Sequence, residues 1–294
     1  MAVIATGFFD GVHLGHRRVI DTLVSLARSR GEASVVVTFW PHPRTVLQDG
    51  ARELRLLTSL QEKKEILHSL GVDRIEVLDF SREFSRLTAE EYLEGVVKER
   101  LGGTALVVGY DNRLGSDHCG PQEISSLASG LGLDCRIVER FGGEEVKISS
   151  TSIRTALAEG RVDDAAKMLG REYSLHGVVV AGNRLGRTIG FPTANMQLYE
   201  PLKLLPGNGV YAVGVETLGG HFRGMCNIGL RPTVTEGTAP YRTVETNIFG
   251  FDEQIYGLDI RLSFIRKIRD ERRFDSLEEL KAQLTKDRQS CIEI

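Results

Sequence analysis

The sequence predicts an α/β protein in which a doubly wound parallel sheet is followed by a small antiparallel β-barrel and a C-terminal helix. Up to Val138, β-branched apolar runs alternate with helical apolar spacing, which is typical of a parallel sheet covered by helices. From Ser174 onward, short strand-like runs are separated by glycine and proline, which is typical of a small barrel. A chain of 294 residues is too long for one comfortable core. We therefore expect two domains, 1–172 and 173–294.

Composition and charge limit the class of function. Hydrophobic residues make up 41% and charged residues 26% of the chain, as in ordinary globular proteins. The net charge of −3 gives no support for a nucleic-acid or membrane-surface role, because either needs a clustered basic excess. No apolar run approaches the roughly eighteen residues of a membrane span, and no signal peptide is evident. We expect a cytoplasmic monomer or weak homo-oligomer with free cysteines, without nucleic-acid or membrane partners.

Each element of the first half has a local signal. Ser34–Phe39 is a β-branched run typical of a strand buried on both faces. Thr58–Gln61 and Thr88–Glu91 have capping-box spacing and each should open a helix, and Pro121 suits a first helical position. The predicted strands are Ala2–Ala5, Ser34–Phe39, Arg74–Phe80, Ala105–Gly109 and Asp134–Val138. The predicted helices are Arg17–Arg30, Thr58–Gly71, Thr88–Leu101 and one that begins at Pro121.

The second half starts with a helical pattern over 151–169 that Gly160 breaks. Asp259–Phe264 alternates polar and apolar residues strictly, as a half-buried antiparallel strand does. A last helix should open at Ser276–Glu279. The predicted strands are Leu175–Val180, Val210–Glu216, Phe222–Ile228, Thr243–Phe251 and Leu258–Ile265. The residues expected on one face of the last helix are Leu277, Leu280 and Leu284.

The stretch Thr6–His16 reads Thr-Gly-Phe-Phe-Asp-Gly-Val-His-Leu-Gly-His and connects the first strand to the first helix. A glycine-rich turn before a helix is where backbone N–H groups and the helix dipole hold a phosphate. His13 and His16 are spaced so that both can point into one pocket, and Gly15 leaves room for a ligand. In a doubly wound sheet, ligands bind beyond the carboxyl ends of the strands. Two further segments are expected at that edge: Trp40–Arg44 and Gly109–Gly115.

A metal site and a core or capping role are the alternatives for the histidine pair. Two histidines are too few metal ligands, and no carboxylate has the His-Glu-x-x-His spacing. We favour phosphate contact because of the strand-to-helix setting. The reaction suited to such a site is attack of a phosphate on the α-phosphate of ATP, which is catalysed mainly by positioning and charge neutralisation.

A second hydroxyl-rich segment, Ile148–Arg154, reads Ile-Ser-Ser-Thr-Ser-Ile-Arg. By itself it is best explained as a helix N-cap with more hydroxyls than it needs. The functional alternative is that Ser150, Thr151 and Arg154 close over a triphosphate, where Arg154 would stabilise the departing charge.

The strongest motif of the second half is Gly182–Asn195, Gly-Asn-Arg-Leu-Gly-Arg-Thr-Ile-Gly-Phe-Pro-Thr-Ala-Asn. Its glycines allow a loop to fold closely around phosphates, although the Gly-Lys-Ser/Thr ending of a Walker A motif is missing. A plain turn explains the glycines but not Thr193 and Asn195, two neutral oxygen donors that suit Mg²⁺. Glu245 and the charged run Ile268–Phe274 would, by themselves, be an exposed strand carboxylate and a solvated surface.

Together these motifs resemble a known family. His13 to His16 and Ile148–Arg154 resemble the H-x-G-H and I-S-S-T-x-I-R motifs of the nucleotidyltransferase superfamily. With Thr38–Pro43 and Val107–Gly115 in the same order, essentially the whole chain resembles the bacterial bifunctional riboflavin kinase/FAD synthetases. The resemblance implies a Rossmann-like nucleotidyltransferase domain that joins FMN to AMP from ATP, giving FAD and pyrophosphate. It also implies a barrel domain that phosphorylates riboflavin with Mg-ATP.

The resemblance also implies roles for particular residues. Glu245 would be the base that takes the proton of the ribityl 5′-hydroxyl, and Thr193 and Asn195 would hold the Mg²⁺ of Mg-ATP. The implied phosphate-handling residues of adenylyl transfer are His13, His16 and Arg154. The implied nucleotide-binding residues are Gly7, Phe9, Asp10, Gly15, Ser150 and Thr151, followed by Gly182, Gly186, Arg187, Gly190 and Pro192. The implied flavin-binding residues are Asp111, Gly115, Arg269 and Glu271.

The chain departs from the family pattern at a few positions. Asn112 and Leu114 stand where aromatic residues are common, and Phe8 stands where asparagine is commoner. Asn247 replaces the usual histidine, and we expect it to point the same way as Glu245 and to be secondary to the chemistry. Two rival functions are a class I aminoacyl-tRNA synthetase relative and a flavin or nucleotide sensor without turnover. The first lacks a Lys-Met-Ser-Lys-Ser loop, and the second is supported only by the residues at 112 and 114.

Overall fold

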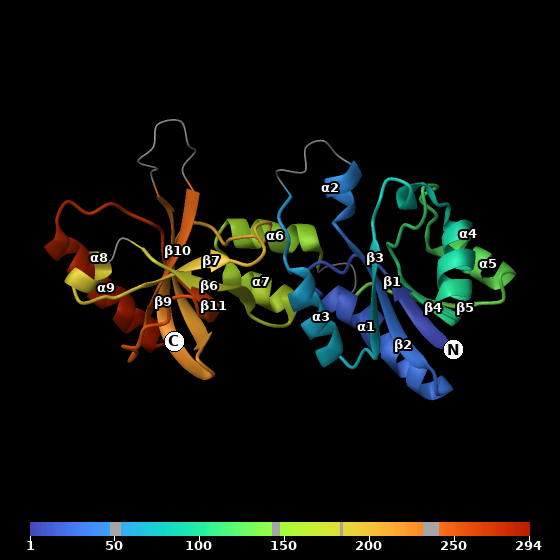
Figure 1. Ribbon diagram of the computed structural model, residues 1–294, viewed down its shortest axis with the longest axis horizontal. Coiled ribbons are helices and arrows are strands. Elements are labelled where there is room, and N and C mark those ends of the chain that lie inside the picture. The colour runs from blue at the N-terminus through green and yellow to red at the C-terminus, as the bar shows by residue number, and fades with distance from the viewer. Residues whose placement is uncertain (48–53, 143–147, 183–184, 232–240) are drawn as a thin grey trace. The chain divides into compact units, whose positions relative to one another are not determined.

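The computed structural model describes residues 1–47, 54–142, 148–182, 185–231 and 241–294 (Figure 1). The chain divides into two compact units, Met1–Ser150 and Thr151–Ile294. The first unit contains a parallel five-stranded sheet and the second a closed six-stranded antiparallel barrel, so the predicted fold class is confirmed. All four cysteines are free, as expected.

The strand order of the first sheet is β3-β2-β1-β4-β5, so the chain reverses its direction across the sheet between β1 and β4. The strands are β1 (Ala2–Thr6), β2 (Ala33–Trp40), β3 (Arg74–Asp79), β4 (Gly103–Gly109) and β5 (Asp134–Val138). The helices are α1 (Leu14–Arg30), α2 (Pro43–Leu47), α3 (Leu60–Ser69), η2 (Phe84–Arg86), α4 (Ala89–Glu91), η3 (Tyr92–Arg100) and α5 (Pro121–Gly130).

Both faces of this sheet are covered, because successive β1 residues enter different cores. Ile4 packs with the buried residues of η3 and α5. Its neighbours Val3 and Ala5 pack with those of α1 and with Leu67 of α3. Helices on both faces exclude water from the strands, which is why β-branched runs without alternation form them. The first turn of α4 is capped by Thr88 and Glu91 as predicted.

One predicted helix start is wrong. The capping box of α3 is formed by Ser59 and Glu62, not by Thr58 and Gln61: the Glu62 N–H donates to Ser59 Oγ at 3.1 Å, and the Ser59 N–H donates to Glu62 Oε2 at 2.7 Å. The Thr58 hydroxyl donates instead to the Asp10 carboxylate. A tertiary contact therefore takes Thr58 away from the helix, and the next hydroxyl caps it.

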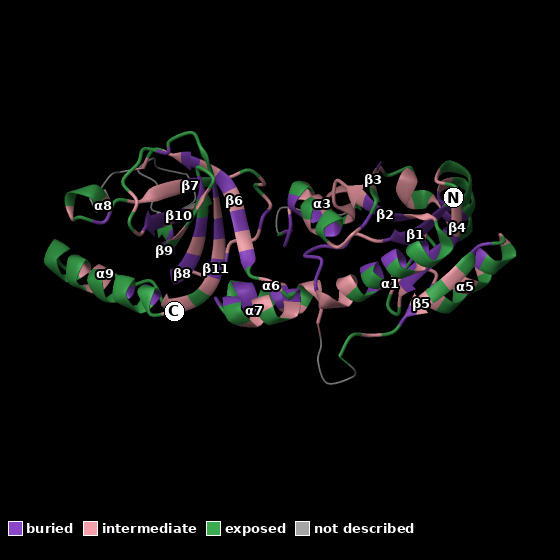
Figure 2. Cartoon of the chain, turned by 90° about the horizontal axis from the view of Figure 1, so that it is seen from below, coloured by how far each residue is buried: buried purple, intermediate pink, exposed green. Residues whose placement is uncertain are grey.

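The barrel order is β10-β7-β6-β11-β8-β9. Its strands are β6 (Tyr173–Val180), β7 (Ala194–Leu198), β8 (Gly209–Thr217), β9 (Gly220–Arg231), β10 (Tyr241–Ile248) and β11 (Asp259–Arg269). The helices of this half are α6 (Ser150–Ala158), α7 (Val162–Leu169), α8 (Leu185–Thr188) and α9 (Leu277–Ile292). Burial alternates along β6 and along the start of β11, as Figure 2 shows for β6 and as the sequence predicts for β11.

This half contains one strand that was not predicted and one prediction that is wrong. Strand β7 has no clear signal in the sequence and is a strand because it pairs with β6 on one side and β10 on the other. Leu277 was expected on the apolar face of α9, but it is 50% exposed. It is the first residue of the helix and lies outside the stripe that packs on the barrel. The residues of that stripe are Leu280, Leu284, Asp287 and Cys291.

Candidate active sites

The turn after β1 is fixed by its backbone and by one buried carboxylate. Phe9 and Val12 adopt left-handed φ angles of 50° and 39°, which are strained for residues other than glycine. Asp10 is 4% exposed and accepts hydrogen bonds from the N–H groups of Leu57 (3.0 Å) and Thr58 (3.1 Å). The segment before α3 therefore holds the turn in place, because a buried carboxylate with charge-assisted hydrogen bonds is costly to release.

The two histidines lie together at the start of α1. The backbone N–H of His16 donates to His13 Nδ1 at 3.2 Å, so His13 is the N-cap of the helix. The rings stack with centroids 3.6 Å apart and planes 14° apart. A Cβ at Gly15 would lie 3.2 Å from the His13 ring, so this position favours glycine. His13 therefore has the capping role that was one alternative for the pair. The two rings also lie together, as their spacing predicts.

His16 is the more unusual of the two. Its Nδ1 is buried and has no hydrogen-bond partner within the described residues. Burial, followed by the charges of His13 and Lys63, holds the pKa of His16 well below its ordinary value. The imidazole is therefore neutral near pH 7.

One residue of the predicted hydroxyl segment, Ser150, contacts the same turn. Ser150 Oγ donates to the backbone carbonyl of Asp10 at 3.0 Å. Thr151 and Arg154 follow in α6, within the second unit.

The loop after β4 contains the predicted flavin residues of the first unit. Asp111 is exposed, and Gly115 has a φ of 76°. A Cβ at Gly115 would lie 2.2 Å from the backbone N of Ala89, so glycine is needed for packing against α4. Leu114 is 7% exposed and belongs to the core of the sheet. The side chain at this expected departure from the family pattern is therefore a core residue and not an exposed flavin contact.

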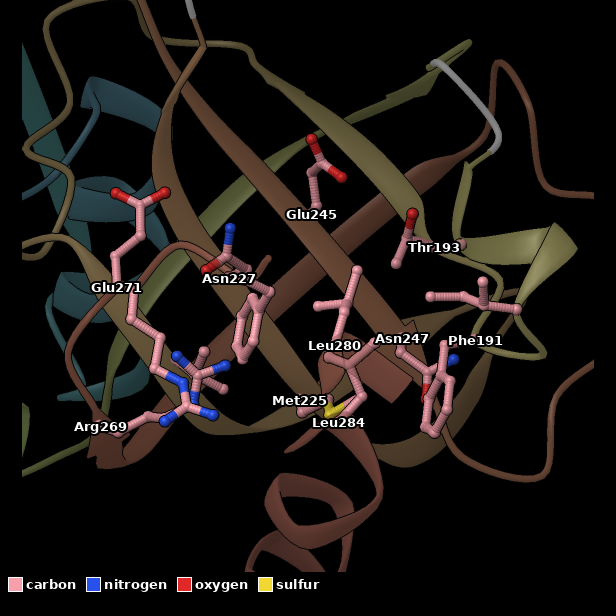
Figure 3. A pocket seen from close by; sticks show the side chains of 15 residues that line it. Phe191, Thr193, Met225, Asn227, Glu245, Asn247, Arg269, Glu271, Leu280 and Leu284 are labelled. Carbon is pink, nitrogen blue, oxygen red and sulfur yellow. The ribbon is translucent and has the colours of Figure 1, made fainter. Parts of the chain in front are cut away.

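The barrel contains a pocket of about 280 Å³ into which polar residues from separate strands point (Figure 3). Glu245 lies on β10, directly opposite Asn195 on β7 and Asn227 on β9. Residues opposite one another in antiparallel strands share a face, so these three form one polar row. The pocket is lined by Gly186, Ile189, Phe191, Thr193, Val210, Met225, Asn227, Glu245, Asn247, Arg269, Glu271, Arg272, Phe274, Leu280 and Leu284.

Asn247 has a clear structural task at this pocket. It lines the same cavity as Glu245, which agrees with the predicted direction. Its side-chain amide donates to the Pro192 carbonyl at 2.7 Å. Asn247 therefore fixes the backbone immediately before Thr193.

The glycines of the 182–195 motif make room for other parts of the motif. A Cβ at Gly182 would lie 2.3 Å from the Asn195 side-chain amide, and one at Gly186 would lie 2.2 Å from the Phe191 carbonyl. Gly190 has a φ of 87° and no neighbour within 4 Å of its Cβ position. The first two glycines thus allow close packing, and the third provides a left-handed turn.

Arg269 and Glu271 are held at the pocket by contacts with residues that no sequence motif marks. Arg269 binds the buried Asp287 carboxylate with Nε at 3.0 Å and Nη2 at 2.8 Å. Asn208 donates to Glu271 Oε2 at 3.3 Å. The charged run is therefore part of the pocket wall and not merely a solvated surface. Nothing local marks Asn208, Asn227 or Asp287, since only strand pairing and helix packing bring them here.

A second pocket of about 380 Å³ shares Thr193 with the first. Thr246 and Ile248 line it, and they alternate along β10 with Glu245 and Asn247. Alternate strand residues point to opposite faces, so the two pockets lie on opposite sides of β10. The other residues that line it are Val179, Arg187, Pro192, Ala194, Phe251, Asp252, Glu253, Gln254, Ile255 and Tyr256.

Known proteins match both units. The family model described as FAD synthetase matches residues 1–152, and the one described as riboflavin kinase matches residues 169–294. The bifunctional riboflavin kinase/FMN adenylyltransferase of Bacillus subtilis is 37% identical, covering 99% of this chain and 92% of its own length. The enzyme of the same name from Escherichia coli K12 is 38% identical, covering 97% and 90%. A crystal structure titled macrolide-efflux protein from Streptococcus pneumoniae is 33% identical, with a TM-score of 0.92, and covers 100% of this chain and 94% of its own.

These matches define a two-domain transferase of flavin nucleotide synthesis. The chain belongs to the bifunctional riboflavin kinase/FMN adenylyltransferase family. It phosphorylates riboflavin with ATP to give FMN, and it adenylylates FMN with ATP to give FAD and pyrophosphate. None of the helices in the described residues is both long and apolar enough to cross a membrane.

Proposed function

We propose that the two reactions use two separate sites. We assign to the residues of each site the roles that their motifs and the family resemblance imply. The observation that supports this best is the barrel pocket. Thr193, Glu245 and Arg269 come from segments far apart in the sequence and line one cavity with Glu271. We also propose a domain boundary near residue 172, a cytoplasmic location, a monomer or weak homo-oligomer, and no nucleic-acid partner.

For the kinase reaction, the first barrel pocket would hold riboflavin. Apolar side chains, including Phe191, Met225 and Leu284, provide a surface for the flavin ring, and Arg269 and Glu271 provide polar contacts at one end. Glu245 would accept the proton of the ribityl 5′-hydroxyl as the bond to phosphorus forms, which a carboxylate within hydrogen-bond reach can do without a large pKa change.

The nucleotide would lie in the second pocket, on the other side of Thr193. Arg187 and Pro192, both predicted to bind nucleotide, line this pocket, together with aromatic and aliphatic side chains suited to a base. Asn195 lies opposite Glu245, so the neutral amide oxygen of one residue and the carboxylate of the other lie in the same cross-strand row. This donor chemistry fits Mg²⁺, which binds few protein oxygens and keeps water and phosphate oxygens. When bound, Mg²⁺ would neutralise charge on the transferred phosphate; Thr193 and Asn195 would hold it.

For adenylyl transfer, the turn after β1 would hold the phosphates of ATP. Gly7, Phe9, Asp10 and Gly15 shape that turn, and the neutral His16 ring lies at the start of the helix that follows it. In this proposal His13, Arg154, Ser150 and Thr151 also contact phosphate, and Asp111 and Gly115 contact the flavin. No general base is needed, because the FMN phosphate is already anionic near neutral pH.

Two substitutions test the separation of the sites. We expect His16→Ala to abolish FAD formation from FMN while FMN formation persists, and Glu245→Ala to do the reverse. Chromatography measures both activities in one protein when riboflavin and FMN are supplied in separate incubations with Mg²⁺ and ATP. Loss of both activities in a folded His16→Ala protein would contradict two separate sites. Riboflavin that is bound and unchanged by the wild type would favour the sensor without turnover.

A further inference from the structure

Lys63 of α3 is a charged side chain that no role given above explains. It is 1% exposed. Its Nζ lies 3.8 Å from the centroid of the Phe8 ring and donates a hydrogen bond to Thr38 Oγ1 at 3.2 Å. The Thr38 hydroxyl in turn donates to the Phe8 carbonyl at 3.2 Å. Lys63 therefore holds the residue at the start of the Gly7–His16 turn through both its ring and its backbone.

The charge of Lys63 is poorly balanced inside the protein. Within the described residues, Thr38 is its one hydrogen-bond acceptor and no carboxylate oxygen lies within 4.0 Å of Nζ. Burial lowers the pKa of Lys63 to about 8, and the more distant Asp10 carboxylate opposes this. A buried ammonium without an ion pair costs free energy, and an apolar side chain of the same length would avoid that cost. The balancing anion would then come from outside the protein.

The position of Lys63 indicates which anion this is. The charged and titratable groups that face it are Asp10, on the turn after β1, and His16, on α1. The other elements against it present the uncharged Thr38, on β2, and Phe8. All of these residues lie at or beside the turn proposed to bind phosphate. In a medium of low dielectric constant a positive charge acts over several ångströms, so Lys63 need not touch the ligand.

We propose that Lys63 is a positioning residue of the adenylyl-transfer site, whose buried positive charge balances the negative charge of a phosphate-bearing substrate at the Gly7–His16 turn. This rests on the proposed function of that turn. The substrate is FMN or ATP, which share this chemistry. Anion binding stabilises the protonated lysine, so the free protein takes up protons as it binds substrate near pH 8 to 9.

The test compares Lys63→Met, Lys63→Arg and the control Lys64→Met on the same helix, in the full chain supplied with FMN and ATP. We expect Lys63→Met to raise the KM of adenylylation about tenfold, because a tenfold change corresponds to one pKa unit of interaction. A higher KM for FMN alone would show that Lys63 balances the FMN phosphate, and a higher KM for ATP alone would show that it balances the triphosphate. Lys63→Arg should keep most of the activity, and Lys64→Met and all kinase rates should match the wild type.

Two further measurements separate a charge from a merely structural side chain. Wild-type adenylylation should decline as pH rises through about 8, and this limb should be absent in Lys63→Met. The melting temperature of Lys63→Met should equal or exceed that of the wild type, because an uncompensated buried charge has been removed. A lower melting temperature together with lost activity that arginine does not restore would show a structural role and overturn the proposal. Wild-type KM values and an unchanged pH profile would also overturn it.

Direct titration with FAD, monitored by flavin fluorescence, tests the role of Lys63 through binding and does not depend on turnover. If the wild type forms no FAD from FMN, the proposed function of the turn fails. If FAD binds equally well to the wild type and to Lys63→Met, the inference about Lys63 fails, whatever the result for turnover.

Discussion

The turn after β1 and the barrel pocket are built in opposite ways. The turn is one contiguous stretch in which a strand end, left-handed residues and a helix start place His13 and His16 within a few residues of each other. The barrel pocket takes its polar residues from β9, β10, β11 and the segment before β7. A local site depends on backbone conformation, whereas a dispersed site depends on register and on helix packing. The two sites should therefore fail under different substitutions.

The largest effect is expected where the dispersed site depends on a buried ion pair. Asp287→Ala leaves Arg269 without the carboxylate that holds it, and removal of one partner from a buried pair costs about 3–5 kcal/mol. We expect a lower melting temperature of the barrel and a large loss of riboflavin phosphorylation, measured by thermal unfolding and FMN formation. FAD formation from FMN should continue.

The control for this prediction is Asp270→Asn. Asp270 pairs with Lys267 but its side chain is 88% exposed, so we expect no measurable change in the kinase. Equal effects of the two substitutions would mean that the Arg269–Asp287 pair does not organise the pocket.

An intermediate effect is expected in the local site from Gly15→Ala. The new Cβ would lie 3.2 Å from the His13 ring and would force the histidines to shift by a few tenths of an ångström. Because small displacements of positioned groups are costly, we expect about a tenfold loss of adenylylation with an unchanged kinase rate.

Gly130→Ala in α5 is a matched control for the change at Gly15, since no atom lies within 4 Å of its Cβ position. Steady-state rates of FAD formation compare the two variants. Full activity of Gly15→Ala would show that the stacked geometry of the histidines is not needed.

The smallest effect is expected from Ser59→Ala, which removes the N-cap of α3. The expected cost is about 1 kcal/mol of stability in the first unit, since an N-cap hydroxyl contributes about that much. Chemical denaturation of the first unit measures it, and both catalytic rates should remain near those of the wild type.

Thr58→Val should instead slow adenylylation, because Thr58 binds Asp10 of the turn. Loss of stability in Thr58→Val together with slower adenylylation in Ser59→Ala would show instead that Thr58 is the N-cap of α3.

The parts of the protein that the sequence predicts are those with short-range causes. Buried strands form from β-branched runs, and capping residues fix helix starts to within a residue, as Thr88 and Ser59 show. The histidine pair is found by its spacing, because a separation of three residues at a helix start places the two rings together. The order of motifs along the chain was sufficient to indicate the family.

What only the tertiary structure decided depends on contacts between distant segments. The row of Glu245, Asn195 and Asn227 exists because three strands pair in one register, and a shift of one residue would turn all of these side chains to the other face. Likewise, Arg269 meets Asp287 only because α9 packs on the barrel, and Lys63 is buried only because α3 lies against the turn after β1. The conformational preferences of individual residues cannot specify these contacts, since the contacts arise from the packing of whole helices and strands.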